Sequence, residues 1–250
     1  MRRSRPVNLP APYLKRVALV PEKVGDWAAY PFCLPMFRER EFEIAFTHPV
    51  TVIVGENGVG KSTLLEGIAV KAGFGHFGGA TGHRLGSHDD EATLSDALAL
   101  SWLPRITRGY FFRAETFFSL VRYMVEAAKE PLSGPPPDWL EMSHGEGFLA
   151  FFRERCAGQG VYFFDEPESA LSPSRQIEFM KILRAMERSG RCQVVIATHA
   201  PLLMAYPGAD LRMLTRAGLF PARIEDTDHF RVLREFFLDP ELFVDSMLDE

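Results

Sequence analysis

The sequence has little of several features that mark well-known classes of protein. Its 250 residues include three cysteines and no Cys-x-x-Cys pair, which indicates neither a disulfide framework nor a zinc site and fits a reducing compartment. No apolar run approaches the roughly 20 residues that a membrane-spanning helix needs. The basic start, residues 1–12, is not followed by the apolar stretch of a secretory signal. We therefore expect a cytoplasmic chain with no membrane span of its own.

Positive charge is also in deficit. The 28 Lys and Arg residues are outnumbered by 33 Asp and Glu, which gives a formal net charge of −5. This balance argues against a strongly basic nucleic-acid binder, although a local basic patch would still attract phosphates. Hydrophobic residues make up 46% of the chain, enough for one large domain with a substantial core.

Strand-like runs alternate with helix-like segments along the chain. Strands are predicted at 13–20, 41–46, 50–55, 161–164 and 192–198, and helices at 61–73 and 173–189. This alternation predicts an α/β fold. We expect a single domain, 1–250, with a core of about 13–73 and 148–240 and a mostly helical insert at about 74–147. Within the insert, a strand or turn is predicted at 109–115.

The most specific motif is GENGVGKST, residues 55–63, which matches G-x-x-x-x-G-K-[ST] and stands between a predicted strand and a predicted helix. Its glycines let backbone N–H groups curl around phosphate oxygens, and the helix N-terminus adds partial positive charge. Lys61 should reach the β- and γ-phosphates of a nucleotide, Ser62 should ligate Mg²⁺, and Thr63 should contact the α-phosphate side. The expected nucleotide-binding residues are Gly55, Glu56, Asn57, Gly58, Val59, Gly60, Lys61, Ser62 and Thr63.

Two further strand ends carry polar side chains. VYFFDEPESAL, residues 161–171, delivers Asp165 to the end of an apolar strand, where its carboxylate can hold Mg²⁺. Glu166 is placed beside it as a general base that polarises water. VIATHAP, residues 195–201, ends at His199, in the crevice where α/β folds bind ligands, and this side chain is positioned to hydrogen-bond a γ-phosphate.

The order of these motifs, with SHGEG at 143–147 between the phosphate loop and the acidic strand, resembles the nucleotide-binding domain of the ABC ATPase superfamily. It is similar in particular to the SMC-like and RecF-like branch and to the small stand-alone AAA family ATPases grouped with it. The resemblance covers about residues 13–240. It implies a P-loop NTPase of ABC type with a helical lobe.

In that family the turn before the helix is the signature motif. The resemblance implies that Ser143, Gly145 and the following helix N-terminus bind the γ-phosphate of ATP held by the other subunit. The implied assembly is a head-to-tail homodimer that closes on two ATP molecules and opens after Mg²⁺-dependent hydrolysis. The catalytic residues would be Glu166, Lys61 and His199, and the metal ligands Ser62 and Asp165.

The sequence departs from the family pattern in three places. The usual L-S-G-G-Q signature reads M-S-H-G-E at 142–146, and Ser172 stands where the S-A-L-D motif has Asp. No Q-loop glutamine is evident. Arg113 or Glu115 is the nearest candidate to face the nucleotide, the alternative being a surface ion pair at the edge of the insert.

Three other segments have two interpretations each. Tyr30 or Phe32 would stack on adenine or else pack in the core. The tail from Asp228 is amphipathic, and we expect it to pack back on the sheet rather than to bind a partner. A Gly-rich segment carries side chains that fit no metal-ligand spacing and favour a mobile loop or partner surface over a metal site: His76, His83, His88, Asp89 and Asp90.

The motifs leave open what the ATPase acts upon. A nucleic-acid clamp for DNA repair or phage defence is favoured by the D-E-P-E strand end and the Arg-rich start, and is weakened by the net charge. The alternative is the motor subunit of an ABC membrane transporter. A third hypothesis is a switch whose dimer state gates a protein partner, such as a toxin or nuclease. Salt-sensitive DNA binding would separate the first hypothesis from the third.

Overall fold

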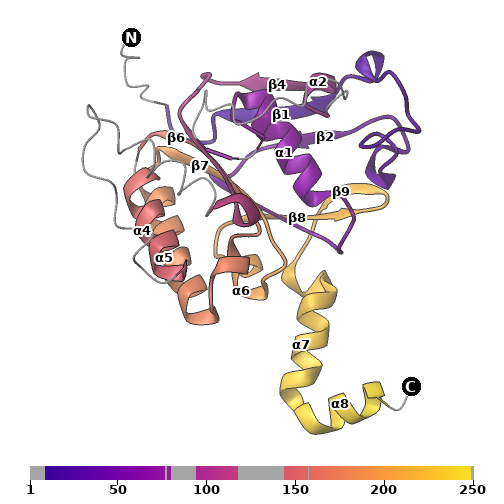
Figure 1. The fold of residues 1–250 in the computed structure, drawn as a ribbon, viewed down its shortest axis with the longest axis vertical. Helices are drawn as coiled ribbons and strands as arrows, with labels where there is room; N and C mark the ends of the chain where they lie inside the picture. The colour runs from indigo at the N-terminus through magenta and orange to yellow at the C-terminus, as the bar shows by residue number, and fades with distance from the viewer. Residues whose placement is uncertain (1–8, 77, 80–93, 118–143, 157, 249–250) are drawn as a thin grey trace.

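The computed structural model describes residues 9–76, 78–79, 94–117, 144–156 and 158–248 (Figure 1). Within these residues the larger sheet has six strands in the order β5-β6-β7-β3-β8-β9. They are β3 (Val50–Val54), β5 (Gly109–Arg113), β6 (Gly160–Asp165), β7 (Cys192–Ala197), β8 (Asp210–Thr215) and β9 (Gly218–Pro221). All neighbouring pairs are parallel except β8 and β9, which form an antiparallel hairpin.

A smaller antiparallel sheet, β2-β1-β4, covers one side of this arrangement. It consists of β1 (Leu14–Leu19), β2 (Glu43–Ala45) and β4 (Leu98–Trp102). Helix α1 (Lys61–Ala72) lies between the two sheets, and the short helix α2 (Leu94–Ala97) packs against it (Figure 1). One hydrophobic cluster joins β1, β4, α1, β6 and β7. Because α1 contacts apolar surface on both sides, it is buried on most of its circumference.

The opposite face of the larger sheet is covered by α4 (His144–Arg155), α5 (Pro173–Arg188) and α6 (Pro201–Met204). Its core is rich in phenylalanine. Phe112 of β5 packs edge-to-face on Phe148 and Phe152 of α4, with ring centroids 4.4 and 4.9 Å apart. Such contacts add to the stabilisation from apolar burial. Strands β6 and β7 are buried along their whole length, as parallel strands covered on both faces must be.

The chain ends in two helices, α7 (Asp228–Leu238) and α8 (Pro240–Leu248), that project away from both sheets (Figure 1). Neither helix has a buried residue. Phe236 and Phe243 pack edge-to-face on each other, with centroids 6.1 Å apart, and hold the bend between them. The expectation that this tail packs back on the sheet is therefore wrong, because an amphipathic pattern requires a partner surface but does not say which one.

The other predicted elements are confirmed, with one correction in the insert. Its described part is not mostly helical: after α2 the chain forms β4, paired with β1, and β5, paired with β6. Strand β5 confirms the strand or turn predicted at 109–115. Strand β4 was missed because five residues, L-A-L-S-W, satisfy a helical pattern as well as a strand pattern. The rest of the insert expected at about 74–147, which is residues 77, 80–93 and 118–143, lies outside the described residues.

Candidate functional site

The phosphate loop connects β3 to α1, and its glycines have conformations that other residues rarely adopt. Gly55 has φ +154°, and a Cβ there would lie 2.4 Å from the carbonyl oxygen of Leu214. Gly60, at φ +102°, is the N-cap of α1 and provides no side-chain acceptor for the first turn. The N–H groups at the start of α1 are therefore available to an anion, as the motif predicts.

Lys61 is the first residue of α1 and is only 4% exposed. Its Nζ donates hydrogen bonds to the carbonyl oxygens of Gly55 (3.0 Å) and Glu56 (2.9 Å), so the ammonium closes the loop from within. Burial lowers the pKa of Lys61, while the nearby carboxylates of Glu166 and Asp165 oppose that shift. The loop thus encloses a cation that faces the acidic ends of the neighbouring strands.

Asp165 stands at the end of β6, with its side chain 7% exposed. It hydrogen-bonds with Ser62, and burial raises its pKa to about 6. Its Oδ1 atom is buried and has no hydrogen-bond partner among the described residues. An orphaned carboxylate oxygen beside a hydroxyl is an incomplete ligand set of the kind that a hard divalent cation completes. Asp165 and Ser62 therefore fit Mg²⁺.

Glu166, the next residue, has a different environment. Its side chain is 41% exposed and its φ of +47° is in the left-handed region, which is rare for residues other than glycine. Its backbone N–H donates to the carbonyl oxygen of Ala197, which fixes the turn against β7. Both carboxylates line a cavity of about 380 Å³ that also contains Ser62, Arg113 and Glu115. One is buried beside the loop, and the other remains accessible to water.

His199 follows β7 and lies beside Glu166, which lines that cavity. Its Nε2 is 3.5 Å from Oε1 of Glu166, and its Nδ1 is 3.2 Å from Nε2 of His229. Burial, with smaller effects from Lys61 and His229, lowers the pKa of His199 to about 4. The imidazole is therefore neutral at pH 7 and can donate only one N–H at a time.

Two residues of the site were missed by sequence reasoning. Glu168 Oε1 accepts hydrogen bonds from the backbone N–H groups of His199 (2.6 Å) and Ala200 (3.2 Å), so it positions the loop after β7. The last Glu of D-E-P-E was the available signal for it. His229, at the start of α7, has no motif around it, and only the fold brings it to His199.

A second and larger cleft, of about 870 Å³, opens beside the phosphate loop. It is lined by Gly55–Val59, by Thr215–Ala217 after β8, and by Asp226–His229 at the base of α7. Tyr30 is not among the described lining residues; its side chain is exposed, and its hydroxyl is 2.6 Å from Oγ1 of Thr63. Phe32 is buried with its ring against Trp27, so for this residue the core-packing alternative is confirmed.

The signature segment is only partly described. Ser143 lies outside the described residues, whereas Gly145 is in the first turn of α4. A Cβ on Gly145 would contact the carbonyl oxygen of Ala170 at 3.4 Å, and the described residues that line the 380 Å³ cavity do not include Gly145. Glu146 accepts a hydrogen bond from Nη2 of Arg175 (2.7 Å). Gly145 therefore lies close to Ala170, which lines the cavity, but is not itself among the described lining residues.

Other candidate residues are placed as follows. Arg113 and Glu115 both line the cavity, and Arg113 also forms an ion pair with Glu66, so both interpretations given for this segment have a basis in the structure. His76 contacts Glu66, with Nδ1 3.1 Å from Oε1. His83, His88, Asp89 and Asp90 lie outside the described residues. No helix in the described part of the chain is long and apolar enough to cross a membrane.

Fold and site together define the class: the chain is an α/β P-loop ATPase. An AAA domain family model matches residues 32–96, and a second AAA domain model, described under AbiEii toxin, Type IV TA system, matches residues 146–205. The two matches contain the phosphate loop and the acidic strand. No curated protein matches the chain at a significant level.

Among solved structures, the chain is similar to a metal-chelate type ABC transporter in an inward-facing conformation, with 16% identity, 88% of each chain covered and a TM-score of 0.50. The SMC head domain from Thermotoga maritima is 16% identical over 84% of this chain and 99% of that one, with a TM-score of 0.46. CbiO1 from Clostridium perfringens, part of the ABC transporter complex CbiONQ, is 17% identical over 83% and 91%, with a TM-score of 0.46. The first of these likenesses shows the ABC-type fold.

Proposed function

We propose that the chain binds ATP with Mg²⁺ at the phosphate loop, hydrolyses it, and uses the nucleotide to close and open a head-to-tail homodimer. The observation that carries this proposal is the convergence of five side chains at the carboxyl ends of β3, β6 and β7. They are Lys61, Ser62, Asp165, Glu166 and His199. They come from three segments that are far apart in sequence, so their meeting at one edge is a property of the fold.

The first group of residues binds and orients. Lys61 balances phosphate charge from inside the loop, and the first turn of α1 donates its free N–H groups. Ser62 and Asp165 would hold Mg²⁺, which supplies charge neutralisation and bridges phosphate oxygens when bound. Binding of a cation also satisfies Oδ1 of Asp165, which is otherwise a buried acceptor without a partner.

The second group, Glu166 and His199, acts at the γ-phosphate: one residue takes a proton from water, and the other hydrogen-bonds the phosphate. Glu166 is exposed enough to meet a water molecule and is fixed in its unusual backbone conformation by Ala197, so we assign it as the general base. The neutral imidazole of His199 donates one N–H toward the γ-phosphate, with its backbone held by Glu168. Adjacent carboxylates with unlike environments are suited to unlike roles.

The position of Gly145 supports the proposed dimer. It lies at the start of a helix of twelve residues, outside the described lining of its own cavity, and the preceding Ser143 completes the signature. A helix start with free N–H groups favours an anion. A second subunit, related by a two-fold axis, can present ATP to it, and the contact is then made twice.

The test is the Glu166→Gln variant. It should bind ATP with near-normal affinity and lose about 10²–10⁴-fold in turnover, because only proton abstraction is removed. The exposed Glu154→Gln of α4 is the matched control and should keep wild-type turnover. Sedimentation of Glu166→Gln with Mg-ATP should show a dimer, and wild-type turnover in this variant would refute the base assignment.

The dimer has its own test in Ser143→Arg. A bulky cation at the signature should block closure while ATP affinity stays near normal, because in this proposal the signature contacts the ATP held by the other subunit and not the subunit's own. Glu154→Arg, which also places a bulky cation but near the other end of α4, should not interfere. Sedimentation in Mg-ATP, combined with nucleotide titration, measures both properties. An ATP-dependent dimer of Ser143→Arg would contradict the split site.

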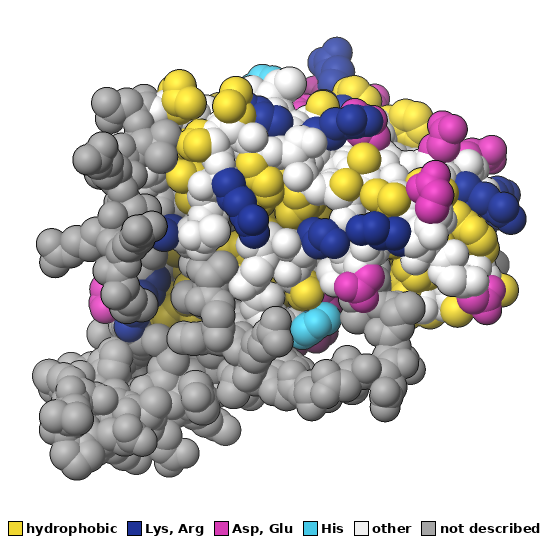
Figure 2. Space-filling model, turned by 90° about the horizontal axis from the view of Figure 1, so that it is seen from above, with side chains coloured by type: hydrophobic (Ala, Val, Ile, Leu, Met, Phe, Trp, Pro, Cys, Tyr) yellow, Lys and Arg dark blue, Asp and Glu magenta, His cyan; other side chains and the backbone are white. Residues whose placement is uncertain are grey.

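We further propose that the closed dimer binds either DNA, in repair or phage defence, or a protein partner. The match of residues 146–205 to a family described under a toxin–antitoxin system supports the second partner. Lys and Arg side chains on the face shown in Figure 2 support the first, although acidic side chains lie among them. The transporter alternative predicts co-purification with a polytopic membrane protein, and the structural likeness supports only its fold.

Fluorescence anisotropy of labelled DNA with the Glu166→Gln protein, over a salt series with and without Mg-ATP, distinguishes DNA from a protein as the partner. Binding only with ATP, weakened steeply by salt, would identify the closed dimer as a DNA clamp. Absence of DNA binding in both states would leave the protein partner, which a pull-down with the trapped dimer would then identify.

A further inference from the structure

Arg113 occupies a position at the site that the motifs did not assign. It ends β5 and is paired in register with Asp165 of β6, so both side chains emerge at the same level of the sheet. Its side chain is 20% exposed, and its Nε lies 3.6 Å from Oδ2 of Asp165, which is an ion-pair distance but longer than a good hydrogen bond. Arg113 thus forms an ion pair with the candidate metal ligand Asp165 but no hydrogen bond from Nε.

A separate carboxylate fixes the guanidinium from the other side. Nη1 of Arg113 donates to Oε2 of Glu66 at 2.8 Å, and more weakly to the carbonyl oxygen of His76 at 3.4 Å. Glu66 lies one helical turn after Ser62 on α1, and therefore on the same side of that helix. Its other oxygen, Oε1, is 3.1 Å from Nδ1 of His76. The three residues connect β5 to the phosphate-loop helix.

This arrangement leaves donors of Arg113 unused. Among the described residues, its hydrogen bonds are all made by Nη1, and Nε is buried with no partner. A buried N–H without an acceptor costs free energy, so native proteins rarely leave one unless a ligand or water completes it. The same side chain lines the 380 Å³ cavity together with Ser62, Asp165 and Glu166. The guanidinium-bearing side chain of Arg113 therefore borders the space where the reacting end of a nucleotide would lie, while its unpaired Nε is buried beside Asp165.

The charges around the cavity also require a cation there. Asp165, Glu166 and Glu115 line it, and each would repel the phosphate chain of a nucleotide. Lys61 compensates from the loop side and Arg113 from the β5 side. A guanidinium fork matches the geometry of phosphate oxygens better than a point charge does.

We propose that Arg113 binds the terminal phosphoryl group of ATP within its own subunit and gives the site its preference for nucleoside triphosphate over diphosphate. Glu66, itself fixed by His76, acts as a positioning residue that keeps the guanidinium aimed at the cavity. The inference rests on the proposed ATP site at the phosphate loop. It differs from a purely structural role, in which Arg113 ties β5 to α1 and influences ATP and ADP equally.

The experiment measures equilibrium binding of ATPγS and ADP to the full chain by calorimetry, once with Mg²⁺ and once with EDTA. Arg113→Gln should weaken ATPγS about 10-fold or more while ADP stays within about twofold, because a charge-assisted hydrogen bond to the end phosphate is lost. The effect should persist in EDTA, because the contact is direct and not through the metal. Equal weakening of both nucleotides, or of neither, would overturn the proposal.

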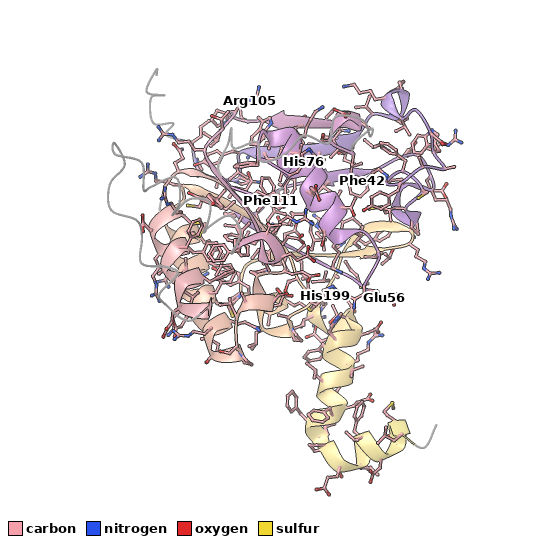
Figure 3. The ribbon with its side chains drawn as sticks, viewed as in Figure 1. Phe42, Glu56, His76, Arg105, Phe111 and His199 are labelled. Carbon is pink, nitrogen blue, oxygen red and sulfur yellow. The ribbon has the colours of Figure 1, made fainter. Side chains whose placement is uncertain are left out.

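Matched variants keep the test decisive. Arg105→Gln removes an arginine that Figure 3 shows well away from Glu56 and His199, and it should change neither affinity. Glu66→Gln, which keeps Arg113 but releases its clamp, should weaken ATPγS less than Arg113→Gln does. If Arg113→Gln does not fold, as judged by thermal melting, Arg113→Lys carries the test, since it keeps the charge and loses the fork.

Lys61→Ala separates this inference from the proposed function. It should abolish binding of both nucleotides. If wild-type protein binds neither nucleotide, or Lys61→Ala binds like wild type, the phosphate-loop site itself fails. If binding depends on Lys61 but the ATPγS preference does not depend on Arg113, the ATP site stands and only the role of Arg113 is refuted.

Discussion

The phenylalanine core and the strand-end site are built on the same strands yet have opposite energetics. Phe164 and Asp165 are neighbours in β6: the first packs on Phe152 and Phe179 in the core, and the second ends the strand as a buried carboxyl group with an unpaired oxygen. In the core, burial stabilises the fold. At the strand end, burial raises the pKa of Asp165 and so costs stability at neutral pH. Burial in the middle of β6 therefore stabilises the fold, whereas burial of the carboxyl group at the end of β6 destabilises it at neutral pH.

The largest effect is expected in the core. Phe152→Ala should lower the free energy of unfolding by about 3–5 kcal/mol, because Phe152 contacts several other rings and its removal leaves a cavity. Urea denaturation followed by circular dichroism measures this loss. A loss below about 1 kcal/mol would mean that the core collapses around the gap and that the contrast with the site is overstated.

The site should show the opposite sign. The pKa of Asp165 is raised in the fold from 3.8 to about 6, so its neutral form is favoured; the stability it contributes is fully present below pH 4 and is lost as pH rises through 6. Asp165→Asn remains neutral, and in EDTA it should stabilise the protein by up to about 3 kcal/mol at pH 8 and by almost nothing at pH 4.

Denaturation curves at the two pH values check this prediction. The exposed Asp245→Asn of α8 is the control and should change stability at neither pH. If Asp165→Asn destabilises the protein at pH 8, the carboxylate is better satisfied in the fold than its orphaned Oδ1 indicates, and the site does not cost stability.

The smallest effect should come from the C-terminal arm, α7 and α8. Phe237 is 73% exposed, so Phe237→Ser should change the free energy of unfolding by less than about 0.5 kcal/mol, although Phe237 and Phe152 are the same residue type. The same urea experiment measures both. A large loss in Phe237→Ser would show that the arm is covered in solution and would remove it from the comparison.

The sequence predicted those parts of the site that are encoded in consecutive residues. Gly55–Thr63 determines a loop by its own glycines, and the apolar run before Asp165 determines a buried strand. By contrast, Glu168 and His229 act through residues some thirty positions away, His199 in both cases, and no local pattern reports such contacts. The position of the arm could not be predicted for a related reason. Its amphipathic pattern lies within the segment itself, but the surface that its apolar face would contact lies outside that segment.

Helix α1 has a mechanical consequence. Its apolar side chains are buried between two sheets, and Leu64, Leu65 and Ile68 are fully inaccessible to solvent. A shift of this helix would disrupt packing on both sides at once, because close-packed interiors do not deform continuously. The phosphate loop is therefore attached to a helix that resists displacement. If ATP binding moves other elements, the change is best measured as a change in their distance from a spectroscopic label on α1.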